Sequence, residues 1–306
     1  MTIKELFIND SGHVRSGWRF AIFLAAFIVS AAFSGGIIML LLHSFAGETG
    51  PASALVLTFN ALAALIPALV IGWLCGKYLE DLPFRALGAS FTNGWLKHLV
   101  LGIAVGGVTL GVAVLFAMAF GGLTFTLNRT AGTFAIISTL GISIIIFTVA
   151  AAFEEVFFRG YMLQTFARAG FAWLAIALTS LFFGFVHMNN PDAGIFSMVN
   201  TILAGVWFGI AYMKTRDLWF VLGLHMMWNW MQGAFFGIEV SGLKEIIAAP
   251  LLREVDRGPA WLTGENYGIE GGIACTLAIL LSIAATHLVS FVKASDEMLA
   301  LTSKRP

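Results

Sequence analysis

The stretch FEEVFFRGYM, Phe153–Met162, carries three charged side chains inside a long apolar segment. The chain of 306 residues is 59% hydrophobic and only 11% charged, whereas soluble domains carry about 25% charged residues. This composition predicts an all-α fold, a polytopic bundle of membrane helices in which every charge is costly. The formal net charge is zero, so the composition does not indicate nucleic-acid binding.

A helix that crosses a bilayer needs roughly 20 predominantly apolar residues. Eight segments meet or approach this pattern, so we expect about eight transmembrane helices over residues 17–292. A short cytoplasmic segment, residues 1–16, would precede this bundle, and a cytoplasmic tail, residues 293–306, would follow it. The predicted segments are Gly17–Phe45, Ala52–Gly76, Leu99–Phe125, Phe134–Phe166, Ala172–His187, Gly194–Met213, Leu218–Phe236 and Gly268–Val292.

Lysine and arginine in the flanks of these segments predict the orientation, because cytoplasmic loops are enriched in them. With the N-terminus in the cytoplasm, 13 lysines and arginines fall in inner segments and 4 in outer ones. Both termini are therefore predicted to be cytoplasmic. On the outer side, Leu243–Val255 is either a short amphipathic segment, which Pro250 would limit, or a loop, and we expect the loop.

Helix geometry separates the charges of the opening stretch. Glu155 and Arg159 are four residues apart, so they share a face and can pair. Glu154 is rotated by about 100° from Glu155 and can point elsewhere. The spacing favours a structural role for Glu155 and a chemical role for Glu154. The alternative is that both glutamates merely neutralise Arg159.

Two further apolar stretches contain histidine. FFGFVH ends at His187, four residues after Phe183, and HMMWNW places His225 and Asn229 four apart on one face. Ionisable groups inside a bilayer are candidates for function, although separate packing roles are the simpler alternative. Counting 1.5 Å per residue puts Glu154 and His187 about 21 and 22 Å from the inner side, and His225 about 10 Å. The first two depths agree, and a common site in the inner half or middle of the bilayer is expected.

Two smaller patterns concern packing. Gly102, Gly106, Gly107 and Gly111 recur at helical spacing in the third segment, which is typical of close helix contacts. The two cysteines, Cys75 and Cys275, lie in apolar runs and are expected to be buried free thiols.

Together, the polar residues resemble the motifs of the CPBP family (CAAX-prenyl-protease and bacteriocin-processing, also called Abi) of intramembrane proteases. The family pattern is EExxxR, then FxxxH, then HxxxN. In this chain the pattern is filled by Glu154, Glu155, Arg159, Phe183, His187, His225 and Asn229. The resemblance implies an eight-helix bundle, with the family core at about residues 134–236, that hydrolyses peptide bonds.

The same resemblance implies roles for the motif residues. Glu154 would be the general base that activates water, helped by His187, while His225 and Asn229 would stabilise the oxyanion. Glu155, Arg159 and Phe183 would be supporting residues, with Arg159 holding Glu155.

The resemblance leaves the cofactor and the substrate open. A divalent metal such as zinc, held by Glu154, His187 and His225, is one possibility, and a metal-free mechanism is the other. The metalloprotease motif HExxH is absent from the sequence. The expected partner is a membrane-embedded or membrane-anchored peptide, either a prenylated tail or a bacterial membrane peptide, and the expected location is a bacterial inner membrane.

A non-enzymatic membrane protein is the rival interpretation. A proton-coupled transporter could use the same Glu and His side chains as a relay, and a scaffold could keep them for packing. Hydrolysis requires Glu154 to meet His187 and His225 at a hydrated cavity. Glu154 facing lipid, far from both histidines, would contradict it.

Overall fold

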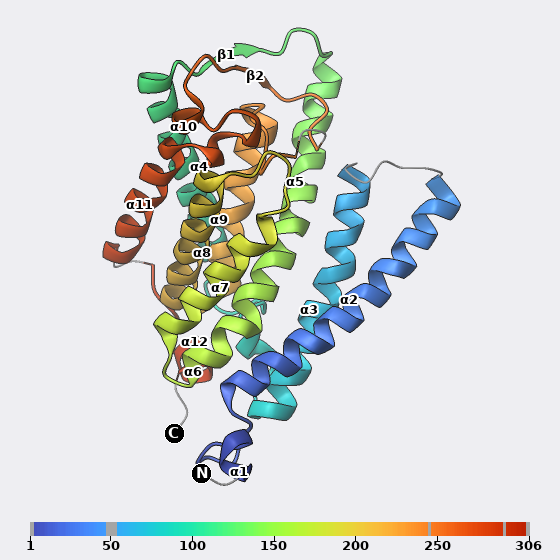
Figure 1. The fold of residues 1–306 in the computed structure, drawn as a ribbon, viewed down its shortest axis with the longest axis vertical. Coiled ribbons are helices and arrows are strands. Elements are labelled where there is room, and N and C mark those ends of the chain that lie inside the picture. Colours follow the sequence, from blue (N-terminus) through green and yellow to red (C-terminus); the bar gives the residue numbers. More distant parts are fainter. Residues whose placement is uncertain (1–2, 47–53, 244–245, 290–291, 304–306) are drawn as a thin grey trace.

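The computed structural model describes residues 3–46, 54–243, 246–289 and 292–303. These residues form a bundle of helices with a small sheet at one end (Figure 1). The α-helices are α1 Ile3–Phe7, α2 Ser16–Ala46, α3 Ala54–Glu80, α4 Trp95–Gly121, α5 Thr133–Glu155, α6 Leu163–Arg168, α7 Ala172–His187, α8 Ile195–Thr215, α9 Leu218–Trp230, α10 Ala260–Thr263, α11 Ile273–Leu288 and α12 Asp296–Thr302. The remaining elements are the π-helical turns η2 Val156–Met162 and η3 Met231–Phe235, the 3₁₀ turns η1 Phe84–Leu87, η4 Glu265–Tyr267 and η5 Ile269–Gly271, and the strands β1 Thr124–Leu127 and β2 Leu252–Val255.

Among the described residues, five helical runs are long and apolar enough to cross a membrane. They are α2, α3, α4, the run Thr133–Arg168 and α8. The other three predicted segments also contain helices, α7, α9 and α11, but these have only 16, 13 and 16 residues. The predicted all-α membrane bundle is confirmed, with five helical runs of spanning length in the described part.

The two ends of the bundle are distinguished by small elements. Helices α1 and α12 lie at one end, which we call the inner end, and β1, β2 and α10 lie at the opposite, outer end (Figure 1). Helices α2 and α3 pack against each other at one side of the bundle.

Helix α9 is central, since it packs against α4, α5 and α8. It begins at Leu218 because the Asp217 side chain accepts hydrogen bonds from the backbone N–H groups of Trp219 and Phe220, at 3.0 and 3.3 Å. Asp217 and Leu218 are both buried, and the Leu218 N–H donates to the Gly88 carbonyl. The start of α9 is therefore fixed by contacts inside the protein.

Glycines let α4 approach α9 closely. A Cβ atom on Gly102 or Gly106 would overlap a carbonyl oxygen of α9, which at Gly106 belongs to Leu224. Gly107 lies against methionine side chains, but a Cβ on Gly111 would meet none of the described residues within 4 Å. The predicted close packing is thus found at three of the four glycines and is wrong for Gly111.

The outer end contains a sheet that was not predicted. Strands β1 and β2 pair antiparallel, with Thr124 opposite Val255 and Leu127 opposite Leu252. The prediction of a helix to Phe125 is wrong, because α4 ends at Gly121, where Gly122 takes a φ of 74°. The prediction of a loop over Leu243–Val255 is also wrong for β2, and residues 244–245 lie outside the described residues.

Buried charges also join the inner ends of the helices. The Glu80 carboxylate of α3 accepts hydrogen bonds from Arg19 of α2, at 2.7 Å, and from Arg168 of α6, at 2.9 Å. All three residues are buried. These two arginines, counted among the inner flanking charges, therefore anchor helices to one another. Cys75 and Cys275 are buried free cysteines, as predicted.

Candidate active site

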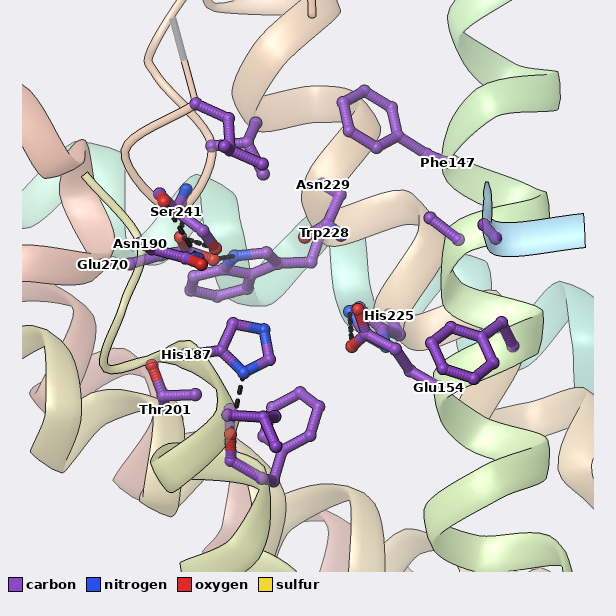
Figure 2. A pocket seen from close by; sticks show the side chains of 18 of the residues that line it. Phe147, Glu154, His187, Asn190, Thr201, His225, Trp228, Asn229, Ser241 and Glu270 are labelled. Atoms are coloured by element: carbon purple, nitrogen blue, oxygen red, sulfur yellow. Dashed lines mark hydrogen bonds and ion pairs between the residues drawn. The ribbon is translucent and has the colours of Figure 1, made fainter. Parts of the chain in front are cut away.

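Three helices bring the predicted catalytic side chains to one cavity (Figure 2). Glu154 lies at the end of α5, His187 is the last residue of α7, and His225 and Asn229 lie one turn apart in α9. All four line a cavity of about 400 Å³. Glu154 therefore faces the cavity that both histidines line.

Glu155 lies at the centre of a buried chain of charged groups. Its Oε1 atom accepts hydrogen bonds from Arg159 Nη1, at 3.1 Å, and from His225 Nδ1, at 2.8 Å. Glu155 is 1% exposed and Arg159 is fully buried. Charges so far from water are tolerated when they are paired and hydrogen-bonded. The pair expected from helix spacing is present, and Glu155 also fixes His225 of another helix, which helix spacing could not indicate.

Aromatic rings enclose the Arg159 guanidinium. Its Cζ atom lies 5.6, 5.0 and 5.2 Å from the ring centroids of Phe158, Phe183 and Phe208. These distances are within the range of cation–π attraction. Arg159 Nη2 also donates a hydrogen bond to the Gly205 carbonyl at 3.1 Å. Phe183 therefore supports the arginine directly, and Arg159 connects the segment after α5 with α7 and α8.

The turn that carries Arg159 is not a regular α-helix. Residues 156–162 form the π-helical turn η2, and all seven are buried. A π turn closes i→i+5 hydrogen bonds and is wider than an α turn. It begins immediately after the two glutamates, so the helix changes its pitch at the site.

Glu154 has greater freedom than its neighbour. Its side chain is 24% exposed, and its Oε2 atom lies 3.8 Å from His225 Nε2. This separation is too long for a direct hydrogen bond. Among the described residues, this oxygen has no hydrogen-bond partner. It is therefore available to a third group in the cavity, such as a water molecule.

The hydrogen bonds of the two histidines indicate their tautomers. His187 Nδ1 lies 2.7 Å from the Phe183 carbonyl oxygen, which can only accept, so Nδ1 carries the proton. A neutral His187 then presents an unprotonated Nε2. His225 Nδ1 likewise donates to the Glu155 carboxylate, which leaves its Nε2 on the side of Glu154. The His225 ring is stacked on Phe208, with centroids 4.7 Å apart.

Residues 133–231 match the family model described as type II CAAX prenyl endopeptidase Rce1-like. This segment is Rce1-like. The match confirms the resemblance to CAAX proteases and supports a protease role in general. With five spanning runs among the described residues, the chain is an integral, multi-pass membrane protein. No curated protein matches the chain.

The Rce1-like segment includes all seven motif residues and the elements from α5 to the first residue of η3. It does not supply the whole cavity. One wall is apolar and comes partly from α3, while polar side chains line another. The apolar wall includes Leu57, Ala61, Ile146, Phe147, Ala150 and Phe153. The polar wall includes Asn190, Thr201, Ser241 and Glu270.

The polar wall was not predicted from the sequence. Asn190 and Ser241 lie in connections between helices, and Glu270 lies in η5 of the outer end. Their positions depend on how these connections fold over the bundle, which no spacing within a helix indicates. The one available signal was Glu270 itself, an acidic residue just inside the last predicted apolar segment.

The carboxylate and imidazole groups of the cavity are also potential metal ligands. A zinc site needs about three protein ligands held close together. Among the described residues, no group of three or more His, Cys, Asp or Glu side chains is arranged to hold a metal ion. Glu154, His187 and His225 share a cavity, but in this arrangement they do not fit a common metal.

Proposed function

We propose that the protein is an intramembrane endopeptidase that hydrolyses a membrane-associated peptide or protein tail. The observation that carries this proposal is the position of Glu154. In the described part of the chain, the Oε2 atom of its carboxylate has no hydrogen-bond partner and lies 3.8 Å from His225 Nε2, and Glu154 lines a cavity shared with His187 and Asn229. Peptide hydrolysis requires a general base, a second basic nitrogen and two potential hydrogen-bond donors.

In the proposed mechanism, Glu154 takes a proton from water, which attacks the scissile carbonyl carbon. His187 Nε2, which is unprotonated in the inferred tautomer, orients the same water by accepting its other hydrogen. Glu154 then passes its proton to the leaving amine. General acid–base catalysis of this kind contributes about 10²- to 10⁴-fold to the rate.

His225 and Asn229 would stabilise the negative charge on the carbonyl oxygen. Glu155 holds His225 by Nδ1, so a protonated His225 can direct its Nε2–H into the cavity. The Asn229 amide lies one turn further along α9 and lines the same cavity. One such donor contributes about 3 kcal/mol to transition-state stabilisation. Arg159 balances the charge of Glu155 and acts through it.

The two walls of the cavity favour a particular kind of substrate. An apolar side chain or lipid group would lie against the wall formed partly by α3, and the polar backbone of the peptide against the opposite wall. A prenylated tail and an unmodified bacterial membrane peptide both have this character. We propose a bacterial inner membrane as the location and the lipid bilayer as the immediate surroundings.

The test is the Glu154→Gln variant, which keeps the shape of the side chain but removes the base. We expect turnover to fall by about 10²- to 10⁴-fold while the thermal unfolding temperature stays within a few degrees. The substrate is sought by comparing peptide termini in membranes from cells that express the original or the Glu154→Gln protein.

The controls are chosen to separate hydrolysis from transport. Ile145→Leu changes an exposed residue of the same helix that does not line the cavity, and it should retain turnover. Full turnover by Glu154→Gln would refute its role as the base. A proton flux in vesicles that requires Glu154, with no change in peptide termini, would favour the transporter instead. Elemental analysis of the purified protein measures its zinc content, and bound zinc would indicate a metal site formed by Glu154, His187 and His225.

A further inference from the structure

A carboxylate outside the Rce1-like segment organises the polar wall of the cavity. Glu270 of η5 accepts three hydrogen bonds through its two oxygens. Oε1 accepts from the Trp228 indole at 3.1 Å. Oε2 accepts from both the backbone N–H and the hydroxyl of Ser241, each at 2.8 Å. Figure 2 places this cluster across the cavity from Glu154.

Ser241 belongs to a short connection, residues 239–243, that we call the strap. Val240, Ser241 and Leu243 of the strap line the cavity. The strap is also held at its edges. Asn190 donates to the Ser241 carbonyl at 3.2 Å, and the Gly242 N–H donates to the Tyr267 carbonyl at 3.1 Å. The strap thus joins the α7–α8 connection to the outer end.

The strap has a conformation that needs support. Ser241 has a φ of 51°, in the left-handed region that residues with a Cβ rarely adopt. Next to it, Gly242 has a φ of 76°, and a Cβ there would overlap the Pro191 carbonyl oxygen. Such a backbone persists only when surrounding contacts hold it. The two hydrogen bonds from Ser241 to Glu270 are contacts of this kind.

The same carboxylate reaches the catalytic helix. Trp228 lies in α9, directly before Asn229 and three residues after His225. Trp228 is 5% exposed, so its indole N–H needs a partner inside the protein, and Glu270 provides it. Glu270 therefore ties the strap to the helix that carries two of the proposed catalytic groups.

We propose that Glu270 is a positioning residue that fixes the strap as one wall of the substrate cavity. This role rests on the proposed function, because it concerns how that cavity holds a peptide. The hydrogen bonds of Glu270 go to Trp228 and Ser241 rather than to Glu154, His187 or His225. Glu270 acts on substrate through the wall it holds, so its loss should weaken substrate binding more than the chemical step.

The experiment compares Glu270→Gln and Glu270→Ala with Glu265→Gln in the full chain. Glu265 is an exposed glutamate of the neighbouring turn η4 and serves as the matched control. Hydrogen exchange of residues 239–243 reports on the strap directly and needs no substrate. We expect exchange at least fivefold faster in Glu270→Ala, because one lost hydrogen bond corresponds to about 1 kcal/mol. Glu265→Gln should leave it unchanged.

Kinetics then test the functional consequence, on a peptide whose cleavage depends on Glu154. We expect Glu270→Gln to raise KM about three- to tenfold, with kcat within about twofold of the original protein. Ser241→Ala, which removes only the hydroxyl donor and is the milder change, should move KM in the same direction. The Ser241→Ala variant keeps the proposal testable if Glu270→Ala does not fold.

Two results would overturn the proposal. One is unchanged exchange of the strap in both Glu270 variants. The other is a faster-exchanging strap whose KM equals that of the original protein. Neither bears on Glu154, whose own variant decides whether the protein is a peptidase.

Discussion

The oxygen Oε1 of Glu155 receives two donors from different helices. Arg159 reaches it from the next turn of the same helical run, and His225 reaches it from α9. The first contact could be predicted from the sequence, because four residues separate the partners in a helix. The second could not, because it depends on the approach of two helices that lie 70 positions apart.

Glu155 thus has two roles, because it neutralises Arg159 and holds His225, and mutations can separate the two. Glu155→Gln leaves the Arg159 charge buried without its counter-charge, and breaking a buried ion pair in this way costs about 3–5 kcal/mol. We expect lower turnover together with a lower unfolding temperature of the purified protein.

The double variant Glu155→Leu with Arg159→Met removes both charges. It should recover much of the lost stability, because no unpaired charge remains, but not the turnover, because His225 loses its acceptor. Recovery of turnover along with stability would show that Glu155 serves only to neutralise Arg159.

At the scale of elements, the contact between α4 and α9 leaves the least space for a larger side chain. The spacing of the glycines in α4 indicated a close contact but not its partner, and only the structure separates Gly106, which abuts Leu224, from Gly111, which faces open space. Leu224 directly precedes His225, so the position of α4 bears on the site.

We therefore expect opposite effects from two alanine substitutions in one helix. Gly106→Ala should destabilise the protein by about 1–3 kcal/mol, because the new methyl group forces α9 away, and it should lower turnover by displacing His225. Gly111→Ala should be neutral or stabilising by up to about 1 kcal/mol, because alanine favours a helix. Thermal unfolding and turnover, measured on both variants, check this contrast; equal effects would contradict it.

Helical segments were predictable from the sequence because a run of apolar residues is a local property. The sheet was not, because β1 and β2 have only four residues each and their paired residues lie far apart in the chain, from 131 positions for Thr124 and Val255 to 125 for Leu127 and Leu252. Strands so short have no periodicity to detect. The same limit applies to Ser241 and Asn190, which reach the cavity through connections between helices.

At the scale of the whole molecule, the uneven distribution of lysine and arginine bears on which side of the membrane the polar wall faces. Helices α1 and α12 both lie at the inner end, and the polar wall of the cavity is formed by connections toward the other end (Figure 1). If the excess of lysine and arginine marks the cytoplasmic side, the strap faces away from the cytoplasm.

Two single cysteines test this orientation. Trp261 on α10 is 53% exposed and Leu299 on α12 is 41% exposed, while the native cysteines are buried. In intact cells, a membrane-impermeant maleimide should label Trp261→Cys at once and Leu299→Cys only after permeabilisation. The reverse pattern would place the polar wall on the cytoplasmic side.

The π-helical turn has a consequence for the length of the chain. Residues 156–162 separate Glu154 and Glu155 from Arg168, which binds Glu80 at the inner end. A π turn takes up one residue more than an α turn, so removing one residue would let this turn close as regular α-helix. The widened turn directly after Glu154 and Glu155 would then be lost. In this stretch, the number of residues therefore matters to the structure as much as their identity does.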